Sequence, residues 1–367
     1  MHPTDAAPEL PLVRGTQAPL EGLDMPGCLA DATPDSWGRR VILARHLGHL
    51  DAQSDTGELS ELTYMLRSAS DRIGALDFQA SPVQYVPRDP GTATLSDLLE
   101  AADQLQTGRV LADPLADAIV RGTSVGGARP KAIVTDGDRS LIAKFSTQTD
   151  TYPVVKAEAV AMALAAKVGI DVPATWTVNV AGRDVLRVER FDRPGDGSRR
   201  QMVSALTMLH LDEMTARYAT YPALADLVRT RFTNPRATLR QLFTRIVFNV
   251  AVGNSDDHAR NHAAFWDGHQ LTLTPAYDLC PQARNTGEVA QAMAIGRDGS
   301  RASRFATCIA AAGTYLLNDT EAADIVEHVE QSVRDGWDEA ASQAQLTGLE
   351  RRRLWGRQIL NPSVYYR

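Results

Sequence analysis

The apolar pattern in the first third of the chain is helical but interrupted. Residues 1–34 are rich in Pro, Gly and Asp and show little periodicity, so they predict an irregular arm. Asp35 can cap a helix in which Leu43, Leu47 and Leu50 fall on one face. The pattern predicts helices at 35–50, 57–73 and 95–120, with a Pro-containing linker at 82–92.

The middle of the chain changes to short β-type runs. Residues 131–135 and 141–145 flank Asp136-Gly137-Asp138, which is a hairpin signal. An Ala-rich segment at 154–168 predicts a helix that stops at Gly169. A second strand pair is expected at 175–180 and 185–191, around Ala181-Gly182. The expected order of strand, strand, helix, strand, strand describes a small sheet with one helix.

The last part of the chain, from Met202 onward, is mostly helical in pattern. Residues 236–252 follow the i, i+3, i+4 spacing and lead into Gly253-Asn254. A third hairpin is expected at 263–266 and 270–274, and helices return over 300–360 with a capping signal at 318–321. A β-rich half followed by a helical half predicts an α+β protein with two lobes, at 35–192 and 193–367. A cleft between lobes is a natural ligand site.

Composition and charge argue against membrane-spanning, secreted, disulfide-rich and general nucleic-acid-binding proteins. Hydrophobic residues make up 44% and charged residues 23%, and no run of 18 apolar residues occurs, so we expect no membrane span. The segment Met1–Pro11 is polar and unlike a signal peptide. Three distant cysteines, Cys28, Cys280 and Cys308, favour a cytoplasmic protein without disulfides or zinc. A net charge of -7 argues against general nucleic-acid binding.

Lysine is rare in this chain and clustered. Of 38 basic residues, four are lysines: Lys131, Lys144, Lys156 and Lys167. Compositional bias explains Lys156 and Lys167, whereas Lys131 and Lys144 fit that explanation and a need for a compact phosphate-binding charge equally well. The arginines from Arg229 to Arg245 fit a solvated helical surface, or contact with DNA, a phosphoserine or an acidic partner.

Candidate chemistry concentrates at residues 254–261. Asp256 and Asn261 have the five-position spacing of the catalytic carboxylate and the metal-binding Asn of protein kinases. Asp278 follows the next hairpin and can share Mg²⁺ with Asn261. A solvated polar turn and a capping Asp are the structural alternatives, and the two elements in order favour phosphoryl transfer.

Three further segments fit a nucleotide site. The small-residue loop at 124–131 allows main-chain N–H groups to approach phosphates. Lys144 on a strand and Glu158 on the following helix have the kinase arrangement that positions phosphates, although Glu158 also fits a surface charge. Glu189–Phe191 fits an adenine-binding hinge and an exposed strand end equally well.

Together these motifs resemble the HipA family of bacterial toxin kinases. The matching segments are S-V-G-G-A-R-P-K (124–131), I-A-K-F (142–145), E-A-V-A-M-A-L-A (158–165), V-E-R-F-D-R (188–193), N-S-D-D-H-A-R-N (254–261) and L-T-P-A-Y-D-L (273–279). Weaker matches are P-D-S-W-G-R-R (34–40) and I-G-A-L (73–76). The ordered set covers about 120–280.

The resemblance implies a two-lobed, protein-kinase-like fold of the HipA type, with a small β-rich N-terminal lobe and a larger helical C-terminal lobe. It also implies a protein Ser/Thr kinase that uses ATP and Mg²⁺. It makes Asp256 the catalytic base, Asn261 and Asp278 the Mg²⁺ ligands, and Ser124 a site of autophosphorylation. Lys144 and His258 complete the expected catalytic set. The residues expected at ATP are Gly126, Gly127, Ala128, Arg129, Pro130, Lys131, Lys144, Glu158, Glu189, Arg190, Phe191, His258, Arg260, Asn261, Tyr277 and Asp278.

The resemblance also implies partners. Family members pair with a small DNA-binding antitoxin, so DNA would be met only through that partner, and they act on translation components such as an aminoacyl-tRNA synthetase. They carry a β-rich module before the P-D-S-W-G-R-R segment, and here about 33 residues precede it, so we expect most of that module to be absent. A small-molecule phosphotransferase and a non-catalytic regulator that binds an antitoxin and DNA are the alternative functions.

Overall fold

A computed structural model describes residues 5–48, 54–88, 93–107, 109, 129–147, 150–284 and 287–366. Contacts divide the chain into two units. The first comprises Met1–Cys28, Thr151–Thr177 and Met202–Arg367, and the second comprises Leu29–Asp150 and Val178–Gln201. These boundaries differ from the predicted lobes, because the helix at 154–168 groups with the C-terminal segment and not with the strands around it.

A four-stranded sheet lies mostly in the second unit, and its strand β5 crosses the unit boundary after Thr177. Its order is β3-β4-β6-β5, and β4 pairs antiparallel with both β3 and β6. The turn between β3 and β4 contains Gly137 at φ 61°, a left-handed conformation that glycine adopts readily. Both predicted hairpins are therefore present. The strands are β3 (Lys131–Asp136), β4 (Arg139–Phe145), β5 (Thr175–Val180) and β6 (Arg183–Glu189).

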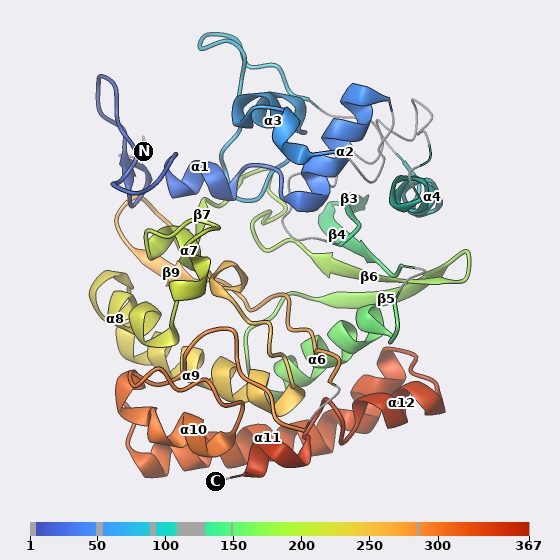
Figure 1. Ribbon diagram of the computed structural model, residues 1–367, viewed down its shortest axis with the longest axis vertical. Helices are drawn as coiled ribbons and strands as arrows, with labels where there is room; N and C mark the ends of the chain where they lie inside the picture. The colour runs from blue at the N-terminus through green and yellow to red at the C-terminus, as the bar shows by residue number, and fades with distance from the viewer. Residues whose placement is uncertain are drawn as a thin grey trace. The chain divides into compact units, whose positions relative to one another are not determined.

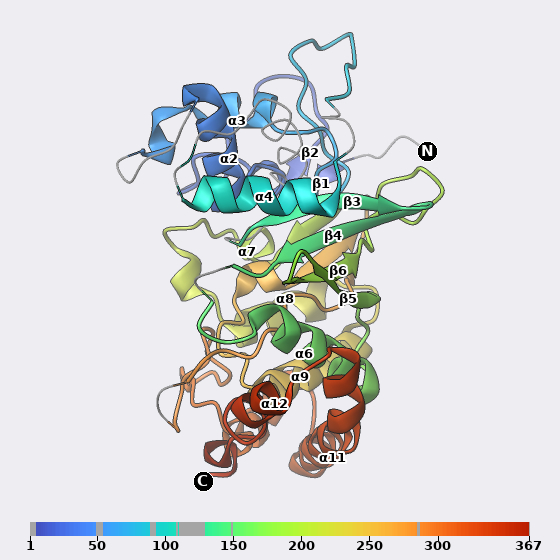
Figure 2. The same cartoon turned by 90° about the vertical axis from the view of Figure 1, so that its right-hand side faces the viewer.

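Helices cover this sheet within the same unit. Helix α4 (Leu95–Gln106) buries Leu98 and Leu99 against Ala143 and Phe145 of β4, and Figure 2 shows α4 crossing β3 and β4. Its other face packs on α2 (Ser36–Leu47), where Trp37 is buried. Asp35 caps α2 by accepting a hydrogen bond from Gly38 N at 2.8 Å, as the sequence predicts. Helix α3 (Glu61–Arg67) is shorter than predicted.

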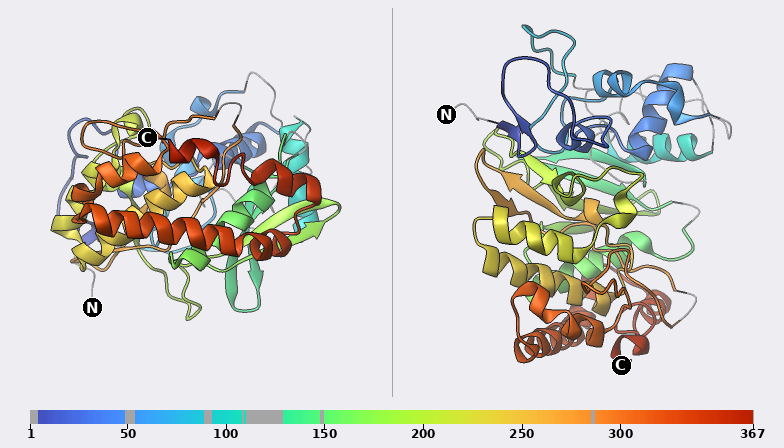
Figure 3. Two further views of the ribbon diagram at one scale, coloured as in Figure 1. Left: turned by 90° about the horizontal axis from the view of Figure 1, so that it is seen from below. Right: turned by 60° about the vertical axis from the view of Figure 1, so that its left-hand side comes forward.

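The first unit is mainly helical. Helix α9 (Pro235–Val252) buries most of its second half and packs beside α8 (Tyr221–Arg231), as Figure 3 shows. Helix α11 (Asp319–Gln343) runs along α9 and α6 (Figure 1). The remaining helices of this part are α1 (Gly27–Asp31), which crosses the unit boundary, α7 (Ala205–Met208), α10 (Phe305–Ala310) and α12 (Gly348–Leu354).

Helix α6 (Val154–Val168) belongs to this unit because of its contacts with α11. A Cβ added at Gly336 of α11 would lie 3.1 Å from Leu164 Cδ2, so the two helices approach closely there. His328 Nε2 lies 3.0 Å from the main-chain O of Val168. The predicted stop is present, since Gly169 is the C-cap at φ 87°. These contacts explain why α6 groups with the C-terminal segment.

Several sequence expectations need correction. The arm at 1–34 contains a short hairpin of β1 (Asp5–Ala7) and β2 (Leu10–Pro11). The hairpin predicted after α9 is present as β8 (Ala263–Trp266) and β9 (Leu271–Leu273), but β7 (Met202–Ser204) adds a third strand that the helical pattern hid. Among the described residues, no helix is long and apolar enough to cross a membrane.

Candidate functional site

The loop at 254–261 begins where α9 ends. Gly253 caps the helix at φ 73°, and a Cβ added there would lie 2.6 Å from the main-chain O of Gln358. Glycine is therefore required at this position for two reasons: the backbone is left-handed, and there is no room for a Cβ atom. The main-chain O of Gly253 accepts a hydrogen bond from Gln282 N at 2.9 Å, which ties the chain beyond Asp278 to the start of the loop.

We predict that Gly253→Ala lowers the thermal midpoint more than Gly299→Ala does. Both glycines have positive φ, but Gly299 at φ 85° has open space around it. A left-handed alanine costs more than about 1 kcal/mol, and the contact with Gln358 O adds to this only at Gly253. Thermal unfolding of the two variants measures the difference, and equal shifts would contradict the packing argument.

The two adjacent acids of the loop have opposite environments. Asp256 is exposed, whereas Asp257 is 1% exposed. A carboxylate that must meet a substrate hydroxyl has to be accessible, and a buried one must be satisfied internally. The structure thus separates a candidate chemical group from a candidate structural group, which the sequence alone does not do.

Asp257 is held by three donors on one oxygen. Its Oδ2 accepts hydrogen bonds from Asn249 Nδ2 at 2.8 Å and from the Tyr221 hydroxyl, and His262 Nε2 lies 2.8 Å away. All of these side chains are buried. Asn254 Nδ2 donates to Asn249 Oδ1 at 3.1 Å and extends the network to the start of the loop. Sequence reasoning missed Tyr221, Asn249 and His262.

The charge of Asp257 is stabilised despite its burial. Burial raises the pKa of this carboxyl, but the facing His262 and the hydrogen bonds from His262 and Tyr221 outweigh it and hold the pKa below its usual range. Burial and the nearby Asp257 raise the pKa of Tyr221 well above its usual value. The pair therefore remains a phenol that donates to a carboxylate across the physiological pH range.

The rest of the loop presents polar groups around Asp256. Asn261 is largely buried, and its Nδ2 lies 3.4 Å from the main-chain O of Asp256. This contact uses the amide nitrogen of the side chain and not its Oδ1 atom. His258 is exposed. Arg260 forms an ion pair with Glu213 at 2.7 Å, and its main-chain O accepts from the Tyr277 hydroxyl at 2.6 Å. This hydrogen bond from Tyr277 links the loop to the residue that precedes Asp278.

Asp278 has an unusual backbone for a non-glycine residue. Its φ is 58°, in the left-handed region, where strained residues often mark functional sites. Two hydrogen bonds anchor the preceding segment. Ala276 N donates to the main-chain O of Asp171 at 2.7 Å, and Arg245 Nη2 donates to the main-chain O of Thr274 at 2.6 Å. The side-chain oxygens of Asn261 and Asp278 are of the ligand type that Mg²⁺ prefers. Mg²⁺ usually binds one or two protein oxygens and retains several water ligands.

The predicted phosphate loop is described only in part. Ser124, Gly126, Gly127 and Ala128 lie outside the described residues. Within them, Arg129 Nη2 lies 2.6 Å from Asp150 Oδ2, and Pro130 leads into β3.

Lys131 and Lys144 are directly opposite each other on β3 and β4. Lys131 is 3% exposed, and its Nζ lies 3.0 Å from Asp35 Oδ2, so the carboxylate that caps α2 also neutralises this lysine. This ion pair gives Lys131 a structural role that the sequence did not reveal. Lys144 is half-buried and paired in register with Leu186 of β6.

The two other lysines, Lys156 and Lys167, each lie near a glutamate of the C-terminal segment. Lys156 Nζ lies 3.3 Å from Glu350 Oε2, and Lys167 Nζ lies 3.9 Å from Glu339 Oε2. Both contacts fit the structural interpretation of these two lysines. Glu158 is a buried residue of α6, not a surface charge. It belongs to the first unit and Lys144 to the second, and their pairing stays a prediction.

The proposed hinge segment contains a buried ion network. Arg190 is 3% exposed, and its Nε and Nη2 lie 3.0 and 2.9 Å from the two carboxylate oxygens of Asp192. Asp192 Oδ2 also accepts from Gly74 N at 2.9 Å, and Arg190 Nη2 donates to the main-chain O of Arg72 at 2.7 Å. The side chain of Arg190 therefore anchors the 72–74 segment, while Glu189 and Phe191 are half-buried.

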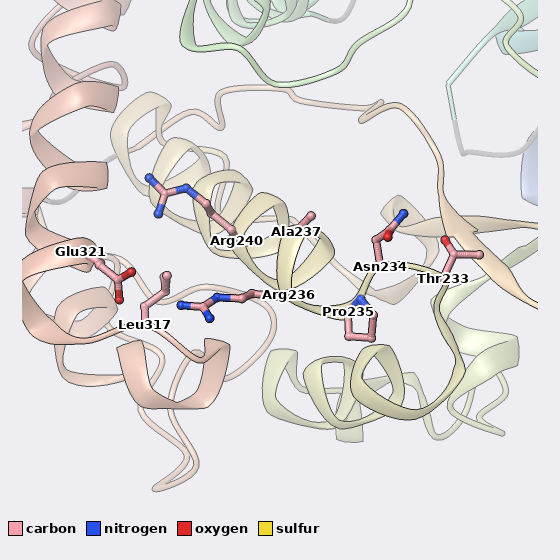
Figure 4. Close-up of a pocket in the computed structure, with 8 residues that line it drawn as sticks. All are labelled: Thr233, Asn234, Pro235, Arg236, Ala237, Arg240, Leu317 and Glu321. Carbon is pink, nitrogen blue, oxygen red and sulfur yellow. The ribbon is translucent and has the colours of Figure 1, made fainter.

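A surface pocket of about 500 Å³ lies elsewhere in the first unit, at the start of α9 (Figure 4). Arg236 and Arg240 extend from the exposed side of α9 toward it, facing Leu317 and Glu321. No predicted site residue lines it; the lining residues are Thr233, Asn234, Pro235, Arg236, Ala237, Arg240, Leu317 and Glu321. The exposure of Arg236 and Arg240 fits a solvated surface and a partner contact equally well, whereas Arg245 is 3% exposed and is not a surface residue.

Comparisons with known proteins agree with the motif pattern. The family model described as "HipA-like C-terminal domain" matches residues 123–337. "Putative kinase Y4mE" of Sinorhizobium fredii is 25% identical over 270 residues, which cover 66% of this chain and 60% of that protein. A "Putative kinase" of Haemophilus influenzae is 24% identical over 180 residues, which cover 43% of this chain and 52% of that protein. The chain thus matches less than two thirds of the length of either relative.

A solved structure shares the fold. The HipA, HipB and operator DNA complex of the Shewanella oneidensis MR-1 toxin–antitoxin system contains a chain that matches with a TM-score of 0.65. That match has 18% identity and covers 98% of this chain and 91% of the other. The similarity confirms the α+β, HipA-like fold class, and the family model covers more than half of the 367 residues. The chain therefore belongs to the family of proteins with a HipA-like C-terminal domain.

Proposed function

We propose that this protein is an ATP- and Mg²⁺-dependent protein Ser/Thr kinase of the HipA type. The observation that carries the proposal is the contrast in the loop after α9, where Asp256 is exposed while Asp257 is buried in a network that holds the loop. Asn261 follows Asp256 at kinase spacing, and Asp278 follows on a left-handed backbone. The match to the HipA-like C-terminal domain and two relatives named as putative kinases support the same activity.

In this proposal each residue has a separate task. Asp256 accepts a hydrogen bond from the acceptor hydroxyl and orients it in line with the γ-phosphoryl group. As the new O–P bond forms, Asp256 takes the hydroxyl proton, the bond from the γ-phosphorus to the bridging oxygen breaks, and ADP leaves. Asn261 Oδ1 and the Asp278 carboxylate hold Mg²⁺, which when bound neutralises charge on the phosphates. Lys144 offsets further phosphate charge, with His258, Arg260 and Tyr277 beside the nucleotide. Main-chain groups of Glu189–Phe191 serve the adenine, since the Arg190 side chain is already used.

Ser124 is proposed as the site of autophosphorylation, and we predict that this modification weakens ATP binding. A phosphoserine adds about -1.5 to -2 charges beside the loop that is assigned to the ATP phosphates. Native mass spectrometry can separate phosphorylated from unmodified protein, and calorimetric titration with an ATP analogue measures each affinity. The matched control is Ser124→Ala after incubation with ATP, which should bind like the unmodified protein. Equal affinity of the two wild-type forms would contradict the prediction.

The proposed protein substrate and partner are those that the family resemblance implies. We propose a protein substrate from the translation apparatus, such as an aminoacyl-tRNA synthetase, and a small DNA-binding antitoxin as partner in the cytoplasm. The Shewanella chain with this fold was solved with HipB and operator DNA, which supports a partner of that kind. DNA would be reached through the antitoxin and not directly.

The test uses purified protein, γ-labelled ATP and Mg²⁺, with and without cell extract. Label on protein, located by mass spectrometry, is the expected result and identifies the acceptor. Label only on small alcohols would favour a small-molecule phosphotransferase. ATP binding without any transfer would favour a non-catalytic regulator.

A further inference from the structure

The segment 289–303 folds back on itself and forms a short antiparallel pairing. Ala290 and Ala302 face each other in this pairing as an antiparallel bridge. On either side of the bridge, the main-chain O of Val289 and the main-chain N of Gln291 bond to the opposite strand at 3.0 and 2.7 Å. Val289 and Gln291 therefore direct these main-chain groups into the hairpin.

The other edge of the first strand contacts the loop at 254–261. Successive residues of a strand direct their main-chain N–H and C=O groups to opposite edges, so those of Ala290, Ala292 and Ala294 point away from the hairpin partner. Ala292 N donates to the main-chain O of Ser255 at 3.0 Å. The main-chain O of Ala294 accepts from Tyr221 N at 3.0 Å. The chain itself thus occupies this edge at two of the three positions.

The third position on the same edge is open. Among the residues that the structure describes, no hydrogen bond reaches the main-chain N–H or C=O of Ala290, and this residue is exposed. Residues two apart in a strand are separated by about 7 Å, so the open position lies roughly that far along the edge from the one that Ser255 occupies. Asp256, the proposed base, is the next residue of the loop and is exposed. An open strand edge readily pairs with another extended chain.

Side chains hold the hairpin in one geometry. Gln291 Nε2 donates to Ser303 Oγ at 2.9 Å, and both of these side chains are buried. The Arg301 guanidinium donates to the main-chain O of Ala292, the residue that bonds to Ser255. An edge that is already ordered costs little conformational entropy when it binds a second chain.

We propose that the protein substrate binds to this edge as an added strand, which brings the acceptor hydroxyl to Asp256. Ala290 N–H donates to a main-chain carbonyl of the substrate, and Ala290 C=O accepts from a main-chain amide of the substrate. The inference rests on the proposed kinase function. Pairing through main-chain groups requires an extended partner and tolerates many side chains. The substrate class is therefore an extended segment with a Ser or Thr, such as a loop or a chain end, and not a helix.

The first test changes the substrate and leaves the protein intact. Short fluorescein-labelled peptides have a central serine, degenerate flanks and, at one flanking position at a time, either alanine or N-methylalanine. N-methylation removes the amide hydrogen that Ala290 C=O would accept. We expect KM to rise roughly 3- to 10-fold at one flanking position with kcat unchanged, as for the loss of one hydrogen bond. A scan in which no position changes KM by more than about twofold would overturn the proposal.

The second test removes the donor with Ala290→Pro. The N–H of this residue points away from the hairpin, so proline leaves the bonds of Val289 and Gln291 in place. We expect KM for the unmethylated serine peptides to rise roughly 3- to 10-fold, with kcat and the KM for ATP unchanged. Ala302→Pro is the matched control, because Ala302 is the bridge partner and its N–H points to the far edge.

The two proline variants are compared after thermal unfolding has shown that both are folded. Equal peptide KM values in Ala290→Pro and Ala302→Pro would refute the role of Ala290. If Ala290→Pro does not fold, the N-methyl scan with the wild type decides alone.

Failure of the proposed function remains separate from failure of this inference. The kinase proposal fails if the wild type labels no protein of the cell extract and no peptide. Fluorescence anisotropy of the same peptides then replaces KM as the readout. Weaker binding when one flanking position is N-methylated, and weaker binding of the unmethylated peptides to Ala290→Pro than to Ala302→Pro, support the edge as the docking site. Equal binding in both comparisons, or no binding at all, overturns it.

Discussion

Replacing Asp256 by alanine should reduce phosphoryl transfer by roughly 100- to 10,000-fold, the range for loss of a general base. The side chain is exposed and lies outside the buried network around Asp257, so the fold should be unaffected. Label transfer from γ-labelled ATP measures the rate, and thermal unfolding checks the fold. Asp324→Ala, which removes an exposed acid from α11, is the control and should keep full activity. Comparable rates in the two variants would refute the role of Asp256.

The neighbouring substitution Asp257→Ala should instead unfold the protein at lower temperature. Removing this buried carboxylate leaves the donors of Tyr221, Asn249 and His262 without their acceptor. Breaking such a buried charged network costs roughly 3–5 kcal/mol. In a unit of this size we expect the thermal midpoint to fall by roughly 6–20 °C.

Matched variants distinguish this network from general damage. Tyr221→Phe removes one donor and leaves the carboxylate in place, so its effect should be clearly smaller than that of Asp257→Ala. A midpoint of Asp257→Ala within a degree of the wild type would contradict the structural role of Asp257.

The same network sets the acid sensitivity of the fold. The folded-state pKa of Asp257 lies below its unfolded value, so its contribution to the free energy of unfolding is fully present above the ordinary Asp pKa of about 3.9. The contribution is lost as the pH falls through the folded-state value. Wild type and Asp257→Ala should therefore differ at neutral pH and converge in strong acid.

Local signals in the sequence predicted much of the fold. The helix at 154–168 and its stop at Gly169 depend on local periodicity and on one left-handed residue, and both are present. The hairpin turns around Gly137 and Gly182 are likewise local. Strand β7 was missed because it has only three residues and exists through its pairing with β8, about 60 positions later.

The roles of individual side chains depended on long-range contacts. Asp256 and Asp257 are chemically identical neighbours, and their difference arises from Tyr221, which lies 36 positions from Asp257. Lys131 fitted a phosphate site until its contact with Asp35, 96 positions away, was known. Packing between distant segments, which no sequence pattern reports, decides both cases.

The most direct test of Asp256 as the catalytic base is the phosphoryl-transfer rate of Asp256→Asn, which keeps the shape of the side chain and removes its basicity. The rate is measured per molecule with γ-labelled ATP, Mg²⁺ and the labelled protein acceptor, on material whose thermal midpoint matches the wild type. If Asp256 is the catalytic base, the rate of Asp256→Asn is at least about 100-fold below the wild type with unchanged ATP affinity. A folded Asp256→Asn protein that transfers phosphate within a few-fold of the wild-type rate would contradict this role.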